Sequence, residues 1–323
     1  MVNIVVSVII PNWNGKELLA RTLDRLKKQS FKDFEIIVVD NGSIDGSVQF
    51  IKEHFPDVNI LSLTENKGFA HACNLGIRYA KGEFIALLNN DAEPDKDWLF
   101  YLTDALSKYT DYSFFASFVL MYDKPDIVDS AGDCFSPFGV AFKRGHRKEA
   151  KKYYKKEKVF GASASASIYR KDFFNHVGFF DEDLYFLYED ADISFRANLF
   201  GLKCLFVPEA KVFHHISASS KKGEGKKVAN FFGPRNIEWV YFKNMPILLI
   251  FLTFIPHLIF IFVAFLLAIK KKRGKLYLKG KFNFFLNLGK IIKKRKQVLK
   301  NKRVSCWDLI KIFKWENLFY RSF

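Results

Sequence analysis

The stretch Phe84-Ile85-Ala86-Leu87-Leu88-Asn89-Asn90-Asp91 decides the fold of this chain. Its first five residues are apolar and predict a strand buried in a sheet, and its last three are polar and end in a carboxylate. Ligands of open α/β sheets bind at the carboxyl ends of the strands. Asp91 is therefore a candidate ligand for Mg²⁺ or Mn²⁺, which prefer hard oxygens and often bridge to substrate phosphates. Taken alone, the stretch also fits an ordinary turn after a strand.

Strands and helices are expected to alternate around this stretch. Continuous apolar runs predict buried strands, and apolar residues at helical spacing predict helices. The expected strands are Ile4–Ile10, Phe34–Val39, Val58–Leu63 and Phe84–Leu88, and the expected helices are Glu17–Gln29, Gly46–Phe55 and Phe69–Ala80. This alternation with short turns predicts an α/β fold, built from βαβ units into a Rossmann-like domain with a mainly parallel central sheet.

The next part of the chain is less regular. Helices are expected at Asp97–Lys108 and Glu189–Phe200, and short strands at Lys203–Val207 and Lys211–His214. The polar, basic segment between them, Val128–Lys158, predicts a loop or a hairpin. The four cysteines of the chain are scattered without a C-x-x-C pair, so the sequence indicates neither a disulfide framework nor a zinc site.

The net charge of +17 is concentrated in the last third of the 323 residues. Residues 1–220 hold 27 Lys and Arg and 30 Asp and Glu, a balance of 27 − 30 = −3. Residues 221–323 hold 24 and 4, a balance of 24 − 4 = +20. The basic part therefore predicts a polyanionic neighbour, which is either anionic lipid headgroups or nucleic acid.

An uncharged apolar segment of 26 residues, Asn244–Ile269, is long enough to cross a bilayer. Lysines flank it on both sides, and Pro256 lies near its middle, so a single span and a re-entrant or interfacial hairpin both remain open. The tail, residues 270–323, carries 18 Lys and Arg against 2 Asp and Glu, interleaved with aromatic and aliphatic residues. That mixture predicts a basic amphipathic helix that lies on a membrane surface.

Polar turns follow all four of the first strands. Their candidate binding residues are Pro11, Trp13 and Asn14; Asp40, Asn41 and Ser43; Lys67 and Gly68; and Asn89 and Asn90. Because the carboxyl ends of parallel strands meet at one edge of a sheet, a nucleotide is expected there. Asp40 can accept a hydrogen bond from a pyrimidine imide, Trp13 offers a ring, and Gly68 allows close backbone approach. Each turn alone also fits ordinary turn chemistry.

A second polar cluster, Tyr188–Arg196, opens a predicted helix. Asp192 and Arg196 are four residues apart and can pair on one helix face, which leaves Glu189 and Asp190 to point elsewhere. A carboxylate held near an acceptor hydroxyl is a workable general base, although acids at a helix start also favour the helix dipole. His214 follows a short apolar strand and is either a metal ligand or a structural histidine.

Six motifs in order resemble family-2 glycosyltransferases of the GT-A fold, and especially the rhamnosyltransferase-like enzymes of cell-surface polysaccharide synthesis. They are Val6–Asn14, Ile36–Ser43, Asn66–Gly76, Leu87–Asp91, Gly178–Glu182 and Tyr188–Arg196. The resemblance covers about residues 4–245. The pair Arg235-Asn236 and the apolar segment after it also resemble the C-terminal region of that subgroup.

The resemblance implies a UDP- or dTDP-sugar donor, Mg²⁺ or Mn²⁺, and direct displacement with inversion at the anomeric carbon. It makes Asp91 the second carboxylate of the metal-binding Asp-x-Asp motif, with His214 as a further metal ligand. Asn89 stands where the wider family has Asp, a departure shared with the rhamnosyltransferase-like subgroup. The implied general base is Asp190, with Glu189 beside it, and Asn74 of the third motif joins the donor-binding residues.

The expected organisation is a catalytic domain over residues 1–243, a transmembrane or re-entrant segment over 244–269 and a membrane-surface tail over 270–323. The expected partners are a glycan or lipid-linked acceptor and the cell membrane, with the catalytic domain facing the cytoplasm. Nucleic acid is not expected, because the basic residues are tethered to an apolar run. A polyprenyl-phosphate sugar synthase and a non-enzymatic polyanion-binding protein remain as alternatives.

Overall fold

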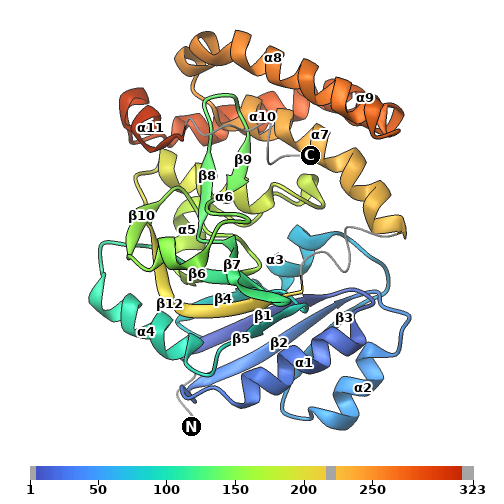
Figure 1. Cartoon of the computed structure of the whole chain (residues 1–323), viewed down its shortest axis with the longest axis vertical. Coiled ribbons are helices and arrows are strands. Elements are labelled where there is room, and N and C mark those ends of the chain that lie inside the picture. The colour runs from blue at the N-terminus through green and yellow to red at the C-terminus, as the bar shows by residue number, and fades with distance from the viewer. Residues whose placement is uncertain (1–4, 216–222, 315–323) are drawn as a thin grey trace.

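The computed structural model describes residues 5–215 and 223–314. Its first half contains four parallel strands in the order β4-β1-β2-β3 (Figure 1). These strands are β1 (Val6–Asn12), β2 (Phe34–Asn41), β3 (Asn59–Leu63) and β4 (Phe84–Leu88). The helices between them are α1 (Lys16–Lys27), α2 (Ser47–His54) and α3 (Phe69–Tyr79). The predicted Rossmann-like half is confirmed; the predicted first strand began at Ile4, which lies outside the described residues.

The sheet extends from β4 through further strands into a mixed α/β architecture. β11 (Ala166–Arg170) is antiparallel to both β4 and β6 (Phe114–Met121), and β12 (Cys204–His214) is parallel to β6. The remaining strands of this sheet are β5 (Ala92–Pro94), β7 (Lys124–Ser130) and β10 (Glu157–Val159). The two strands predicted near residues 203–214 are one strand, in which a register shift between Val207 and Lys211 interrupts the regular pairing with β6.

Helices cover both faces of the sheet. Val8 and Ile10 of β1 pack in the cluster that contains α1, α2 and α4 (Trp98–Lys108), whereas Ile9 packs in the cluster that contains α3 and α5 (Phe173–Val177). α6 (Glu189–Leu199) contributes Ile193 to that second cluster. Burial on both faces explains why the strands are continuous apolar runs rather than alternating ones.

The segment predicted as loop or hairpin contains a hairpin. β8 (Asp133–Phe135) pairs antiparallel with β9 (Ala141–Lys143), and β7 and the 3₁₀ turn η1 (Ala150–Tyr153) flank the pair. The hairpin stands above the central sheet and reaches the C-terminal helices (Figure 1). It also brings Lys143 to the edge of the sheet where β4 ends.

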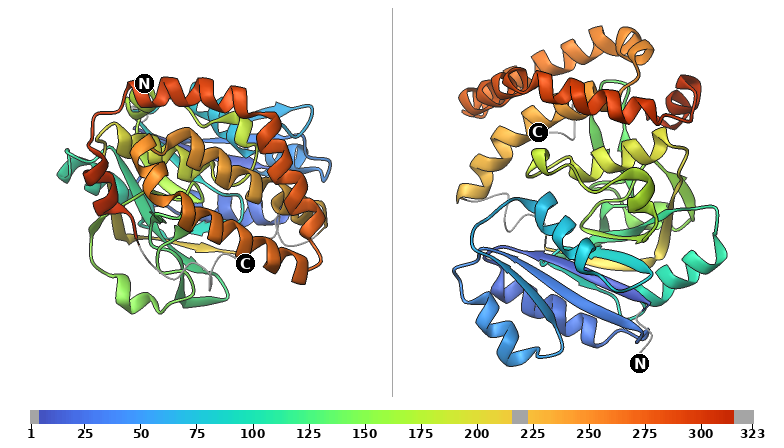
Figure 2. Two further views of the ribbon diagram at one scale, coloured as in Figure 1. Left: turned by 90° about the horizontal axis from the view of Figure 1, so that it is seen from above. Right: turned by 180° about the vertical axis from the view of Figure 1, so that it is seen from behind.

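A layer of helices lies at the opposite end of the molecule from β1–β3 (Figures 1 and 2). They are α7 (Gly223–Asn244), α8 (Ile247–Lys270), α9 (Gly274–Leu286), α10 (Leu288–Lys300) and α11 (Cys306–Ile312). α8 continues through Pro256, so this structure does not contain the break that a hairpin requires. Thr253, His257 and Phe260 are buried on either side of the proline, and that packing supports the helix where the proline removes a hydrogen bond.

The C-terminal helices share a hydrophobic core with the domain that precedes them. Phe135 of β8 and Phe195 of α6 pack in one cluster with Trp239 of α7, Phe284 of α9 and Leu309 of α11. α7 and α9 approach closely at Gly280, where an added Cβ would collide with the carbonyl oxygen of Phe231. The helical layer is therefore packed into the fold rather than appended to it.

Candidate functional site

A pocket of about 520 Å³ opens where β1, β2 and β4 end. It receives residues from the polar turns, from the loop before α6, from β9 and from the N-terminal turns of α7. The predicted site residues that line it are Pro11, Trp13, Asn41, Gly68, Asn89, Asn90, Asp91, Glu189, Asp190 and His214. The structure therefore gathers ten of the predicted residues around one cavity, at the sheet edge where α/β folds bind ligands.

The turns after β1 and β2 are tied together by Asp40, Asn12 and Ser43. Asp40 Oδ1 accepts from Asn12 Nδ2 at 3.0 Å, and Asp40 Oδ2 accepts from the Ser43 backbone N–H at 3.0 Å. Ser43 Oγ in turn accepts from the backbone N–H of Asn14 at 2.9 Å. Asp40, Ser43 and Asn14 lie beside the pocket rather than in its lining. Each oxygen of the Asp40 carboxylate has a further lone pair and can accept another hydrogen bond. Contact between Asp40 and the base of a donor nucleotide stays a prediction.

The third turn is fixed in the same way. The Lys67 backbone N–H donates to Asn41 Oδ1 at 2.9 Å, while the Lys67 side chain is exposed. Gly68 has a φ of +92°, and a Cβ there would collide with Tyr185. Glycine at this position therefore lets the loop before α6 close against the third turn.

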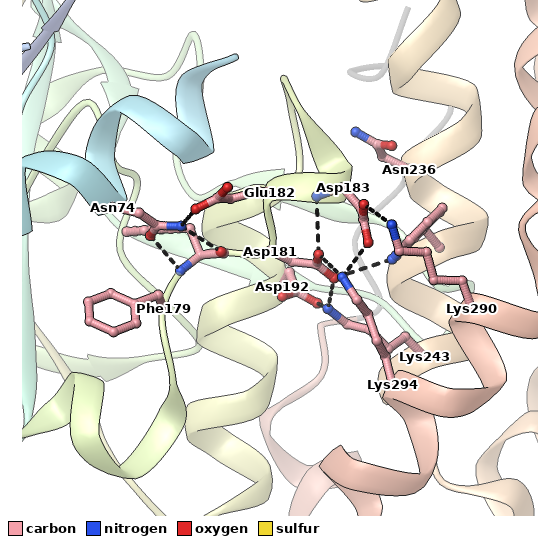
Figure 3. A network of polar contacts seen from close by, with 12 residues as sticks. Asn74, Phe179, Asp181, Glu182, Asp183, Asp192, Asn236, Lys243, Lys290 and Lys294 are labelled. Carbon is pink, nitrogen blue, oxygen red and sulfur yellow. Dashed lines mark hydrogen bonds and ion pairs between the residues drawn. The ribbon is translucent and has the colours of Figure 1, made fainter. Parts of the chain in front are cut away.

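Asn74 does not face the pocket. Its Nδ2 donates to the Phe180 carbonyl at 2.9 Å and to Glu182 Oε1 at 2.8 Å, and its Oδ1 accepts from the Phe180 N–H at 2.9 Å (Figure 3). All polar atoms of this buried amide are thus used to hold the segment before η2 (Glu182–Leu184). These bonds give Asn74 a structural role and it does not line the pocket, so donor binding by Asn74 stays a prediction.

Asp91 and His214 meet at the floor of the pocket. His214 Nε2 lies 3.0 Å from Asp91 Oδ1, and His214 Nδ1 lies 2.9 Å from Asp129 Oδ2. Burial opposes protonation of the ring, but the hydrogen bonds to Asp129 and Asp91 prevail and raise the pKa of His214 to about 9. For Asp91, burial acts to raise the pKa, yet the bond from His214 holds it below the usual range.

Asp129 and Lys143 were not predicted and complete this cluster. Lys143 Nζ donates to Asp129 Oδ2 at 2.7 Å and lines the pocket. Burial would raise the pKa of Asp129, but the charge of Lys143 and the bonds from His146 and His214 lower it well below its usual range. Asp129 is therefore an anion that fixes the orientation of the His214 ring through Nδ1.

Oxygen and nitrogen atoms at this position suit a divalent cation. Asn89 Oδ1 is buried and has no hydrogen-bond partner among the described residues, so the pocket floor holds an unused oxygen close to Asp91 in the chain. Within residues 5–215 and 223–314, no three His, Cys, Asp or Glu side chains cluster as ready metal ligands. A cation held by Asp91 and His214 would thus depend on phosphate oxygens of a bound donor, as Mg²⁺ sites commonly do.

Glu189 and Asp190 enter the pocket at the start of α6. Asp190 Oδ1 accepts from the Ala191 backbone N–H at 2.8 Å. Burial raises the pKa of Asp190, and burial together with the nearby Asp190 charge raises that of Glu189 further. Glu189 Oε2 has no hydrogen-bond partner among the described residues. A buried carboxyl with a raised pKa is typical of a catalytic base.

The other acid of this helix faces away from the pocket. Asp192 pairs with Arg196 at 3.0 Å, which confirms the predicted helix-face pair, and also accepts from Lys243 of α7 at 2.6 Å. Lys243 bonds Asp181 as well, at 2.6 Å, and Lys294 of α10 bonds Asp181 and Asp183 (Figure 3). Burial would raise the pKa of Asp181, but the two ammonium groups hold it below its usual range.

The loop between η2 and α6 has an unusual backbone. Tyr185, Leu187 and Tyr188 all have positive φ, and each such residue costs about 1–3 kcal/mol unless neighbouring structure supports it. Asn236 of α7 supplies that support, because its Nδ2 lies 2.7–3.0 Å from the carbonyl oxygens of Leu184, Phe186 and Leu187. α7 therefore positions the loop that leads directly into Glu189 and Asp190.

Residues 7–178, more than half of the chain, match the family described as Glycosyl transferase family 2. The chain belongs to glycosyl transferase family 2. Family-2 membership accounts for the Rossmann-like sheet and for the pocket at its carboxyl edge. The match ends before α6 and the C-terminal helices, so it does not cover Glu189, Asp190 or His214.

Two relatives illustrate how far the likeness extends. The chain is 28% identical over 247 residues to the amylovoran biosynthesis glycosyltransferase AmsB of Erwinia amylovora, covering 72% of this chain and 77% of AmsB. It is 25% identical over 276 residues to a chondroitin synthase of Pasteurella multocida (strain Pm70), covering 76% of this chain. The chain spans only 28% of that synthase, which is a much longer protein.

Solved structures agree with the fold. The S. aureus protein TarS (residues 1–349), in complex with UDP, has a TM-score of 0.51 and 18% identity, covering 74% of this chain and 66% of the TarS chain. The mannosyltransferase PcManGT of Pyrobaculum calidifontis, in complex with GDP-Man and Mn²⁺, has a TM-score of 0.50 and 16% identity, covering 92% and 88%. At these identities the likeness shows the GT-A fold alone.

Proposed function

We propose that this family-2 protein is an inverting glycosyltransferase that moves a sugar from a nucleotide diphosphate-sugar to a glycan acceptor during polysaccharide assembly. One observation carries the proposal: a single pocket contains both the Asp91–His214 pair and the half-buried acid Asp190. The first is suited to a diphosphate and its cation, and the second to deprotonating an acceptor. The relative AmsB acts in amylovoran biosynthesis, which supports a polysaccharide role.

The donor nucleotide is proposed to bind along the turns after β1, β2 and β3, with Trp13 and Asn41 in the pocket lining. Asp91, His214 and the unpartnered Asn89 Oδ1 would hold Mg²⁺ or Mn²⁺ at the diphosphate. Such a cation neutralises negative charge on the leaving nucleoside diphosphate. Lys143, which also lines the pocket, adds positive charge beside the same position.

Asp190 is proposed to accept the proton of the acceptor hydroxyl as that oxygen attacks the anomeric carbon. A single base and a direct displacement give inversion, because the acceptor bond forms on the face opposite the departing diphosphate. The loop held by Asn236 sets where this carboxylate lies, since it connects η2 to the first residue of α6. Rhamnosyl transfer is the proposed specificity, on the basis of Asn89 in place of the first Asp of the Asp-x-Asp motif.

The acceptor is proposed to be lipid-linked, with the enzyme on the cytoplasmic face of the cell membrane. α8 is the one helix in the described part of the chain that is long and apolar enough to cross a membrane. An apolar element beside the catalytic domain would place the pocket near a lipid-anchored glycan.

The alternative enzyme, a polyprenyl-phosphate sugar synthase, also needs a location at the membrane. Incubation with donor and polyprenyl phosphate would separate the two functions, because only the synthase transfers the sugar to the phosphate itself.

A thermal-shift panel of nucleotide sugars tests the donor class. Because ligand binding to the folded state raises stability, saturating UDP- or dTDP-sugar with Mn²⁺ or Mg²⁺ is expected to add about 3–4 kcal/mol to the free energy of unfolding at 100–1,000 times Kd. The matching donor without metal is expected to give a smaller shift. Equal shifts from nucleotide sugars and from free sugars, or none from any nucleotide, would contradict the proposed donor class.

Replacing Asn236 by alanine tests the proposed positioning of the base. Asn236→Ala removes the amide that bonds three carbonyls of the strained loop, so the loop should relax and displace Asp190. Sugar transfer at saturating donor is expected to fall about ten- to a hundredfold, with little change in donor affinity. Lys227→Ala, at an exposed position on the same helix, should retain the wild-type rate. Equal rates for the two variants would remove Asn236 from the mechanism.

A further inference from the structure

α8 has one face buried against the protein along nearly its whole length. The buried residues follow helical spacing and are Leu249, Thr253, His257, Phe260, Ala264 and Ala268. From Leu249 to Ala268 an α-helix extends about 28 Å, close to the roughly 30 Å thickness of a bilayer's hydrocarbon core. If α8 crossed that core, the protein surface beneath this stripe would have to lie inside the hydrocarbon with it.

That surface is too polar to lie in hydrocarbon. His257 Nε2 lies 2.9 Å from Glu238 Oε2, and Lys281 of α9 donates to the same carboxylate. His257 also bonds the Phe138 carbonyl at 2.6 Å and stacks on Tyr241 at 3.8 Å. These contacts anchor the middle of α8 to α7 and to the turn between β8 and β9, and Lys281 ties α9 to the same carboxylate of α7. A charged pair under the helix midpoint, within a bilayer core, would be costly.

The opposite face of α8 is a continuous exposed apolar stripe. Its members are Ile247, Leu248, Phe251, Leu252, Phe254, Ile255, Leu258, Ile259, Phe262, Leu266 and Ile269. Phe251 is 77% exposed and Phe262 is 61% exposed, so large rings face outward from both halves of the helix. α8 lies across the end of the molecule's longest axis, and its outer face points away from the sheet (Figure 1).

The neighbouring helix adds apolar side chains and an apolar groove at the same end of the molecule. Phe282 and Leu286 of α9 are 64% and 68% exposed. With Leu278 and with Phe231 of α7 they line a groove of about 420 Å³. α8, α9 and this groove are called here the apolar platform.

Charge identifies what the apolar platform contacts. Lys270, Lys271 and Lys272 are exposed at the end of α8, and Lys275 and Lys279 are exposed on α9. Between residues 239 and 307 the chain has no Asp or Glu. An apolar surface rimmed by cations and without acids matches the boundary between acyl chains and anionic headgroups.

We infer that α8 is a monotopic helix, lying in the plane of an anionic phospholipid bilayer with the apolar platform embedded and the catalytic domain above it. This inference extends the membrane location proposed above but does not depend on which sugar is transferred. Because a bilayer adds binding energy in proportion to the apolar area it covers, exposed rings on the outer face should dominate the affinity.

Flotation of the full chain with vesicles tests the surface. Binding to vesicles of phosphatidylcholine with about one third phosphatidylglycerol should exceed binding to phosphatidylcholine alone and weaken with salt. The double variant Phe251→Glu, Phe262→Glu should bind about tenfold or more weakly. Phe100→Glu, at an exposed ring on α4, is the matched control and should bind as the wild type does. Equal losses in both variants, or none, would overturn the inference.

Depth measurement distinguishes an in-plane helix from a spanning one. Single labels placed by Phe251→Cys, Ile259→Cys and Ile269→Cys, in a Cys306→Ser background, would report depth through quenching by spin-labelled lipids; the other three cysteines are buried. The in-plane arrangement gives one shallow depth for all three. Ile259 much deeper than both ends would overturn it in favour of a span or a hairpin. Donor binding, measured in parallel in detergent, tests the proposed function separately.

Discussion

Replacing Asp190 by asparagine (Asp190→Asn) is expected to lower sugar transfer by about 10²–10⁴-fold while leaving donor binding intact. The substitution keeps the size of the side chain and the hydrogen bond from the Ala191 N–H, but it removes the proton acceptor. Single-turnover transfer with saturating nucleotide sugar, together with calorimetric donor affinity, would measure the two effects separately.

The control for this substitution is Asp57→Asn, which makes the same chemical change at an exposed turn. Wild-type transfer should also fall as pH drops through the pKa of Asp190, which burial raises above the usual aspartate range, because only the ionised carboxylate accepts a proton. Near-wild-type turnover by Asp190→Asn would exclude it as the base. In that case Glu189→Gln would be the next variant, since Glu189 enters the same pocket.

The second large effect is expected from Asp91→Asn, which should weaken donor binding in Mn²⁺ or Mg²⁺ by about 10–100-fold. The asparagine removes a charge from the floor of the pocket, while His214 keeps its bond to Asp129 and so keeps its orientation. Chelation with EDTA should then weaken donor binding strongly in the wild type and little in the variant. Isothermal titration with and without metal measures both.

Asp126→Asn, at an exposed position on β7, is the matched control and should respond to metal as the wild type does. Two results would contradict the proposed metal site: wild-type transfer that is unaffected by EDTA, or an Asp91→Asn variant whose donor affinity still rises with added Mn²⁺. Either result would instead assign neutralisation of the diphosphate to Lys143, the nearby cation of the pocket lining.

The first half of the fold was predictable because its signals are local. Each strand of the β1–β4 sheet is rich in apolar residues and is followed by a polar turn. Because the strands are parallel, the sequence also indicates that these turns lie at one edge of the sheet. The convergence of Asp91 and His214, 123 residues apart, followed from the family resemblance and not from spacing.

Other parts of the site depended on tertiary contacts that no local pattern reports. Asp129 and Lys143 lie in the segment without periodicity, so nothing in the sequence linked them to His214. Helical spacing indicated that α3 would be buried but not that Asn74 would meet Phe180 instead of the pocket. The prediction that Asn74 binds the donor rests on the family resemblance of its motif alone.

The contacts of the charged side chains in the basic tail, residues 270–323, were also not predictable from the sequence. Composition alone predicts that all of its lysines are exposed to solvent and face a membrane. The structure separates them: Lys290 and Lys294 pair with Asp181 and Asp183, while Lys270–Lys272 and their neighbours stay exposed. Charge counting gave the sign of the surface but could not assign individual residues to ion pairs.

The Lys243 ion pairs have a consequence for how the protein can be divided. Lys243 is almost fully buried and bonds both Asp181 and Asp192, while Lys294 gives Asp181 a second cation from α10. A fragment truncated before α7 would leave the buried Asp181 without both of its cations and Asp192 with Arg196 alone, and it would uncover Phe195 and Phe135 of the shared core. We therefore expect a fragment that ends before α7 to be much less stable than the whole chain.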